Sequence, residues 1–158
     1  DETVVALHDR LAELGAQLLV ETVAQIEAGT ATRTPQDHDK ATLAPMLGRE
    51  LSPMDFTRTA RQLHDQVRGL IPWPAAVTTL GDKRCKVFQT VVPEEQTHAA
   101  PGTVLAAGKE GLAVACGKGT VLRLEEIQPD GGKRMKAADY LRGHPIAVGT
   151  VLALPEHN

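Results

Sequence analysis

The second half of the chain is a series of short apolar runs separated by glycine turns, and this pattern constrains the fold more than any other feature. Runs at 76–80 and 85–92 flank Gly81-Asp82, a dipeptide typical of a tight β-hairpin. Further runs span 102–106, 112–116, 120–127 and 150–154, with a helical turn at 137–141 before the last. This spacing predicts a mainly β domain, and we expect an OB-like Greek-key barrel of five or six strands.

The beginning of the chain has the periodicity of a helix instead. Valine and leucine recur at every third or fourth position from 4 to 18, which places them on one helical face. Gly15 is expected to divide this segment into two short helices, the second of which ends at Gly29. Two such helices have no sheet of their own to cover, so we interpret residues 1–29 as the end of a larger layer or an arm that needs a partner surface.

Residues 30–57 lose this periodicity, and prolines recur there among threonine, aspartate and glutamine. A connection of this length without structure of its own predicts an interdomain linker. A helical stripe follows at 60–70, with Thr57 or Thr59 as its N-cap. The helix should end before Pro72, because the residue that precedes a proline avoids the helical conformation.

Charge is distributed unevenly along the sequence. The 17 basic and 20 acidic residues give a net charge of −3. The bases of the second half gather in two clusters, Lys83-Arg84-Cys85-Lys86 and Lys133-Arg134-Met135-Lys136. Such clusters on an acidic chain favour a local anionic partner, although surface lysines that serve only solubility are the competing explanation.

Aromatic residues are few, which affects how the core and any RNA-binding surface are built. Only Phe56, Trp73, Phe88 and Tyr140 are aromatic, so we expect a core of valine, leucine, isoleucine and alanine. Trp73 is interpreted as a plug between the helix at 60–70 and the barrel. With one aromatic residue in the expected strands, a basic barrel would bind a folded RNA through its backbone and shape rather than by base stacking.

No pattern in the sequence indicates catalysis, a metal site or a membrane span. The six histidines have no metal-ligand spacing, and Cys85 and Cys116 form no CxxC pair, which favours two reduced thiols in a cytoplasmic protein. Nucleophile-elbow, phosphate-loop and dinucleotide motifs are missing. No apolar run approaches the roughly 20 residues that cross a bilayer. A binding role is therefore the expectation for this stretch.

Five strings in order along the chain resemble the methionyl-tRNA formyltransferase family. They are HDRLAELGA at 8–16, EAGTA at 27–31, VRGLIPWPAAVT at 67–78, APGTV at 100–104, and LEEIQP at 124–129 followed by GKRM at 132–135. Each string alone is a weak signal. Their common order over nearly the whole chain makes the resemblance strong.

The resemblance implies that the chain is the C-terminal part of such an enzyme. Residues 1–29 would be the last helices of its Rossmann-like formyltransferase domain, 30–57 the interdomain linker, and 58–158 the OB-like tRNA-binding domain. The family's catalytic Asn-x-His segment does not occur in the sequence. We therefore expect no catalytic, cofactor-binding or metal-binding residue here, and no activity from this stretch alone.

The resemblance also implies a reaction and a partner. The full enzyme would transfer a formyl group from 10-formyltetrahydrofolate to the α-amino group of initiator methionyl-tRNA, as a cytoplasmic monomer without a membrane or metal requirement. This part would hold the tRNA. The residues expected to bind tRNA are Arg68, Lys83, Arg84, Lys86, Lys133, Arg134 and Lys136.

Two other interpretations remain open at this point. The domain could belong to a formyltetrahydrofolate hydrolase or dehydrogenase, or to a sugar-nucleotide formyltransferase, which share this kind of C-terminal domain. It could also be a non-catalytic RNA-binding OB module. The apolar helical stripe at 4–18 disfavours the free-standing module, because such a module has no use for it.

Overall fold

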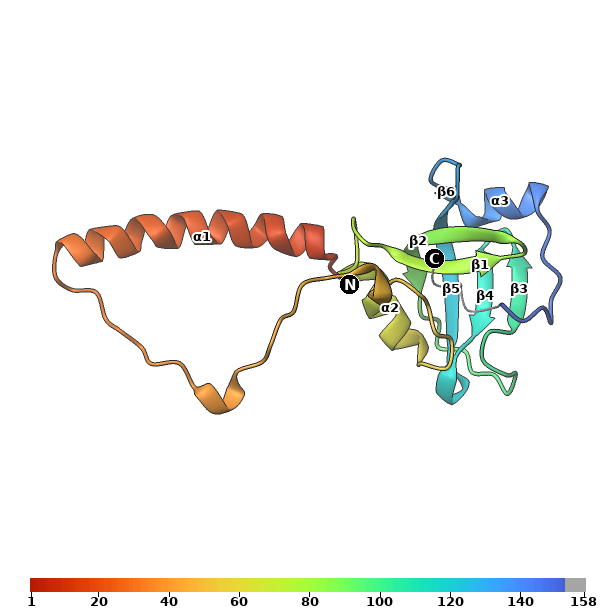
Figure 1. The fold of residues 1–158 in the computed structure, drawn as a ribbon, viewed down its shortest axis with the longest axis horizontal. Coiled ribbons are helices and arrows are strands. Elements are labelled where there is room, and N and C mark those ends of the chain that lie inside the picture. The colour runs from red at the N-terminus through yellow and green to blue at the C-terminus, as the bar shows by residue number, and fades with distance from the viewer. Residues whose placement is uncertain (153–158) are drawn as a thin grey trace. The chain divides into compact units, whose positions relative to one another are not determined.

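The computed structural model describes residues 1–152 and forms two compact units (Figure 1). One unit is Glu2–Met46, and the other, which also includes Asp1, begins at Leu47. The two units are described separately below. No helix among the described residues has the length and apolar character needed to span a membrane.

The unit Glu2–Met46 consists of one long helix and an extended segment. Helix α1 runs from Val4 to Glu27, and the side chain of Thr3 caps it by accepting a hydrogen bond from the backbone N–H of Ala6. The expected break at Gly15 is wrong, because a glycine costs a helix only about 1 kcal/mol and the helical hydrogen bonds continue through it. Gly29, with φ of 69°, follows the helix end as predicted. None of the residues of α1 is buried.

The second unit is built on a six-stranded antiparallel sheet. Its strands are β1 (Ala76–Leu80), β2 (Lys83–Val91), β3 (Val104–Gly108), β4 (Gly111–Ala115), β5 (Val121–Pro129) and β6 (Met135–Lys136). The order is β1-β2-β5-β4-β3, and β6 pairs with β5. The first five predicted strands are therefore confirmed, with ends that differ by at most two residues.

The sixth strand lies elsewhere than expected. In the described part of the predicted strand 150–154, Val151 forms only an isolated bridge to Thr103, and residues 153–154 lie outside the described residues. The sixth strand is β6 instead, which at two residues is too short to give a detectable alternating pattern. The hairpin at Gly81-Asp82 joins β1 to β2 as predicted.

Two helices pack on the sheet. Helix α2 (Ala60–Gly69) presents Leu63 and Val67 to the core and stops before Leu70, which confirms the predicted helix. Helix α3 (Ala137–Gly143) follows β6 directly, where a helical turn was expected. Figure 1 shows the strands between these two helices.

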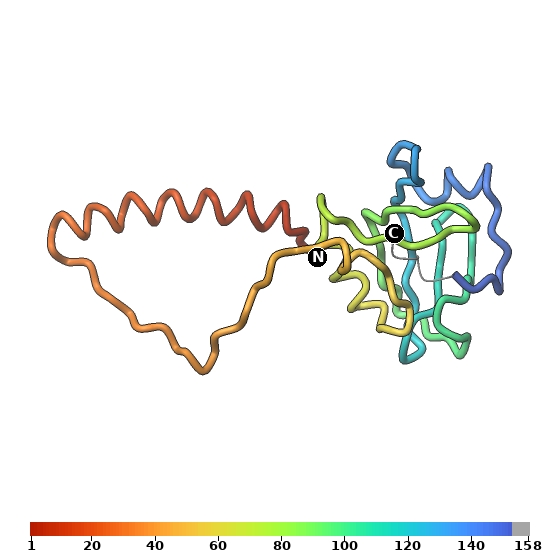
Figure 2. Tube along the Cα trace, viewed as in Figure 1, coloured from red at the N-terminus to blue at the C-terminus, as the bar shows by residue number. Residues whose placement is uncertain are grey.

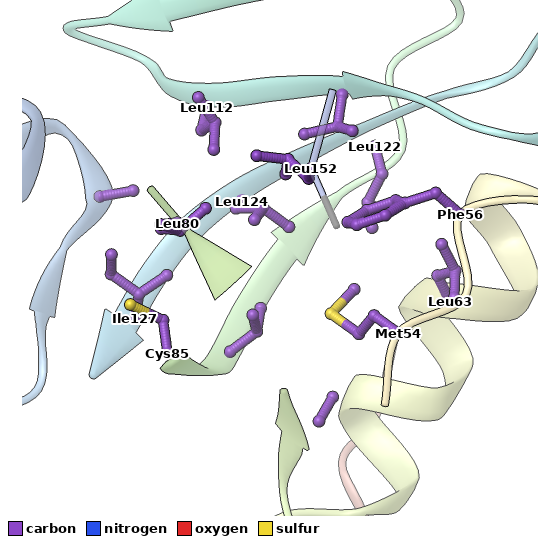
Figure 3. Packing of buried hydrophobic residues seen from close by; sticks show 14 of the residues in the cluster. Met54, Phe56, Leu63, Leu80, Cys85, Leu112, Leu122, Leu124, Ile127 and Leu152 are labelled. Atoms are coloured by element: carbon purple, nitrogen blue, oxygen red, sulfur yellow. The ribbon is translucent and has the colours of Figure 1, made fainter. Parts of the chain in front are cut away.

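The core joins both helices to the inner face of the sheet. Figure 3 shows the part of it next to α2, with Leu63 of that helix. Leu112, Leu122 and Leu124 come from the strands and are fully buried. Met54 and Phe56 also lie in this core, so the last residues of the predicted linker pack against the sheet. The division of the chain into parts of a larger enzyme stays a prediction.

Irregular segments of the same chain pair with part of each outer edge of the sheet. Beside β1, the backbone of Ser52 and Met54 exchanges hydrogen bonds with Val77. Beside β3, the Gly149 N–H donates a hydrogen bond to the Val104 carbonyl, and the Val104 N–H donates to the Thr150 carbonyl. The trace of residues 144–152 runs past β3 in Figure 2. Because β1 and β3 end the strand order, closure into a Greek-key barrel stays a prediction.

The N-terminus of α2 is closed by side-chain hydrogen bonds. The Thr59 side chain accepts a hydrogen bond from the Gln62 N–H, and the Gln62 side chain accepts one from the Thr59 N–H, which is a complete capping box. We expect Thr59→Ala to lower the free energy of unfolding by about 1 kcal/mol, measured by urea denaturation. Thr34→Ala, at an exposed site in the extended segment, should change it by less than about 0.5 kcal/mol. Equal midpoints for both variants would contradict the role of the cap.

Candidate nucleic-acid interface

The first basic cluster lies on β2, where strand geometry turns its cations outward. Side chains alternate between the two faces of a strand. Cys85 and Val87 are buried in the core, so Arg84 and Lys86 point to the outer face. Two cations of the predicted site therefore share one side of the sheet.

The second cluster reaches the same face through β6. Lys136 lies opposite Glu126 of β5, while Met135 pairs with Ile127 and packs against the core. Arg134 donates hydrogen bonds to the Glu126 carboxylate, and its Cζ lies 4.5 Å from the ring centroid of Phe88 on β2. A cation above an aromatic ring is attracted by the ring's electron density.

Arg134 therefore connects β6 to β2 across β5, and the structure brings the two clusters together. We call the outer surface of these three strands the basic face, and its four cations are Arg84, Lys86, Arg134 and Lys136. One of its charges is already neutralised in part, because Arg134 pairs with Glu126.

The other three residues of the predicted site lie at or beyond the margin of the basic face. Lys83 is exposed at the start of β2, and Lys133 is exposed in the turn that precedes β6. Arg68 lies on α2 and donates to Asp65, and this hydrogen bond lowers the pKa of the Asp65 carboxyl. Arg68 thus belongs to a different element and has a carboxylate neighbour on its own helix.

A groove continues the basic face past β2 toward the edge of the sheet. It has a volume of about 370 Å³ and contains Arg84 and Lys86 from the basic face. The other lining residues come from four places: the segment 49–53, the loop that follows α2, strand β1, and the turn that follows β5. They are Arg49, Glu50, Ser52, Pro53, Trp73, Pro74, Val77 and Asp130.

Trp73 and Arg49 are the members of this groove that sequence reasoning missed. The interpretation of Trp73 as a buried plug is wrong, because 54% of the residue is exposed. Met54 and Phe56 take the buried space near α2 instead. The prolines on both sides of Trp73 were the available signal, since they fix φ and remove backbone donors, which keeps this loop out of helix and sheet.

The groove contains charges of both signs. Among the described residues, Arg49, Arg84 and Lys86 form no ion pair, so their charges are available to a ligand. Glu50 and Asp130 line the same groove and can accept hydrogen bonds. The site therefore offers an indole surface, three cations and two carboxylates within one hollow.

Beyond Glu126 the outer surface becomes acidic. Arg123 of β5 has its Nη1 3.2 Å from an oxygen of Glu110 and its Nη2 3.8 Å from an oxygen of Glu95. Glu125 lies in the same region. Lys136 of β6 lines the same pocket as these carboxylates, so the positive charge is concentrated on β2 and in the groove.

The described part of the chain contains no metal centre. No three histidine, cysteine or carboxylate residues gather to hold an ion within residues 1–152. Both thiols are buried in the core. The site is suited to binding an anionic partner over a surface.

Comparison with protein families supports a formyl-transfer context. The family model described as "Formyl transferase, C-terminal domain" matches residues 47–145. The methionyl-tRNA formyltransferase of Bacillus subtilis (strain 168) is 45% identical over 153 residues, which cover 97% of this chain and 48% of the relative. That of Acetivibrio thermocellus is 44% identical, with 96% and 49% covered. The chain spans about half the length of these curated relatives.

Solved structures share the fold. HypX from Aquifex aeolicus, crystallised in complex with tetrahydrofolic acid, superposes with a TM-score of 0.58 at 20% identity and covers 84% of this chain and 23% of that one. A HypX variant gives a TM-score of 0.62 at 19% identity, with 89% and 26% covered. At these identities the likeness concerns the fold.

Proposed function

Because the chain belongs to the family of formyl transferase C-terminal domains, we propose that it is the RNA-positioning part of a methionyl-tRNA formyltransferase. The enzyme would transfer a formyl group to the α-amino group of the methionine carried by initiator tRNA. In this proposal the basic face holds the tRNA while the amine reacts. Holding the RNA in a fixed orientation lowers the entropic cost of bringing the amine to the formyl donor.

The observation that carries the proposal is the meeting of two sequence-distant basic clusters on one face. The 4.5 Å contact between Arg134 and Phe88 joins them, on a chain whose net charge is −3. Cations concentrated on one surface of an acidic protein suit a polyanion that must bind in one orientation. The choice of initiator tRNA as the polyanion rests on the two relatives above, since both carry the name methionyl-tRNA formyltransferase.

The formyl donor in this proposal is 10-formyltetrahydrofolate, held by a part of the enzyme other than this chain. The groove next to Lys109, Glu110 and Arg123 is open and lined by charged side chains. A folate ring system needs a mostly apolar, enclosing pocket with a few placed polar groups. This groove does not have that character, which supports placing the donor elsewhere in the enzyme. A cytoplasmic, monomeric full-length enzyme belongs to the same proposal.

The proposal includes the finer architecture of the β unit. We assign its curved sheet to the OB Greek-key class. Support comes from the five-strand order with β1 and β3 at its ends and from the register shifts in β2, which strengthen strand bending.

The test compares cations on and off the basic face. Lys86→Ala with Lys136→Ala should weaken binding of initiator methionyl-tRNA to the 158-residue chain. Each phosphate contact that is lost should lower the slope of log K against log salt by about 0.7 to 0.9. We expect a total decrease of about 1 to 2, measured by anisotropy of labelled tRNA at several salt concentrations.

A charge-matched variant serves as the control. Arg61→Ala with Lys118→Ala removes the same charge from α2 and from the turn between β4 and β5. It should leave the slope unchanged. An equal decrease in both variants, or a chain that does not bind the tRNA, would overturn the proposed function.

A further inference from the structure

We infer that the groove beside Trp73 binds one unstacked nucleotide of the RNA, with its base on the indole ring. The inference rests on the proposed function and adds a single-stranded contact to it. It would extend RNA binding from the basic face to the edge of the sheet, because Arg84 and Lys86 belong to both surfaces.

The first support is the exposure and setting of Trp73. An indole usually buries most of its surface, yet 54% of this residue is exposed, and it has no hydrogen-bond partner among the described residues. Its loop is nevertheless held in place, because the Ala75 N–H donates to the Leu70 carbonyl at 2.9 Å and Ala75 is buried. A fixed, exposed aromatic ring is what base stacking requires.

The second support is the position of the cations around the ring. Lys86 lies directly opposite Val77 in the β1–β2 register, and Arg84 lies opposite Thr79, so both line the side of the groove formed by β2. Arg49 lines it from the 3-10 turn η2 (Arg49–Leu51). A base on Trp73 would thus have cations near it for its flanking phosphates.

The two carboxylates distinguish a nucleotide from a simpler anion. Glu50 and Asp130 line the groove and repel a bare phosphate or an acidic peptide. They accept hydrogen bonds from a base N–H or from a ribose 2′-hydroxyl. An aromatic surface with mixed charges matches the mixed chemistry of a nucleotide, and the volume of about 370 Å³ lies in the range of small-ligand sites.

Trp73 is the single tryptophan of the chain, so it serves as an intrinsic fluorescent probe of the groove. All intrinsic tryptophan fluorescence therefore reports on this groove. A base that stacks on the indole should quench this fluorescence, whereas a phosphate bound to the cations alone should leave it nearly unchanged. We would titrate the 158-residue chain with initiator methionyl-tRNA, with an unstructured RNA octamer, and with a blunt duplex of the same length.

We expect quenching by the tRNA and by the single-stranded octamer, and no quenching by the duplex or by inorganic phosphate. Trp73→Ala should weaken octamer binding about tenfold, measured with labelled RNA, because one base–aromatic stack is lost. Trp73→Phe should restore most of the affinity, since it keeps an aromatic face. Val148→Ala, at an exposed apolar residue elsewhere in the unit, should leave the affinity unchanged.

The outcomes separate this inference from the proposed function. If tRNA binds with its salt dependence intact, but Trp73 is not quenched and Trp73→Ala binds equally well, the nucleotide site is overturned while the basic face stands. Equal quenching by the duplex would also overturn it. If the tRNA does not bind, the proposed function itself fails.

Discussion

Gly117→Ala should lower the free energy of unfolding by about 3 kcal/mol, at the upper end of what an added methyl costs in a packed site. Gly117 begins the turn between β4 and β5, and its N–H donates to the carbonyls of Phe56 and Arg58. A Cβ at this position would lie 1.9 Å from the Thr57 carbonyl oxygen. Because the obstacle is backbone, no side-chain rotation relieves the clash.

Urea denaturation of the full chain measures this effect, and Gly108→Ala is the matched control. A Cβ at Gly108 meets no atom within 4 Å, so this variant should change stability by less than about 0.5 kcal/mol. A loss below about 1 kcal/mol for Gly117→Ala would mean that residues 56–58 move away freely. The packing of that segment against the turn would then contribute little to the fold.

Both thiols should be nearly inert in the folded protein. Burial raises the pKa of Cys85 to about 11 and that of Cys116 to about 12, from a usual value of about 8.5. Only the thiolate reacts, so at pH 8 we expect modification by a disulfide reagent to be at least about a hundredfold slower than in guanidinium. Two rapidly reacting thiols under native conditions would contradict the buried positions.

The same burial links stability to pH. The folded chain holds the thiol protons more tightly than the unfolded chain, because its thiol pKa values are raised. The buried thiols therefore add to the free energy of unfolding. This added stability is complete below about pH 8.5 and decreases as the pH rises toward 11 and 12. Unfolding midpoints measured between pH 8 and 10 should therefore fall with pH.

The first five strands were predictable because each is marked by local chemistry. Gly81 between two β-branched runs identifies the first hairpin, and the stripe of Leu63 and Val67 after Thr59 identifies α2. The break at Gly15 was predicted wrongly because a glycine's cost is small when the helical hydrogen bonds continue on both sides.

The groove depended on information that local patterns do not contain. Arg49, Trp73 and Arg84 come from three separate segments, and only the register of β1 on β2 and the packing of residues 52–54 beside β1 bring them together. Trp73 was misplaced because its size favours a core. Whether the core has room for it depends on Met54 and Phe56, which were expected in a linker.

The partial pairing of the two sheet edges also bears on self-association. A bare edge strand offers unpaired N–H and C=O groups that can recruit another chain, which is a common beginning of aggregation. Ser52 and Met54 occupy those groups at Val77, and residues 149–152 occupy them at Gly102 and Val104. Pairing at these positions leaves fewer backbone groups along the two edges for a second copy to bind.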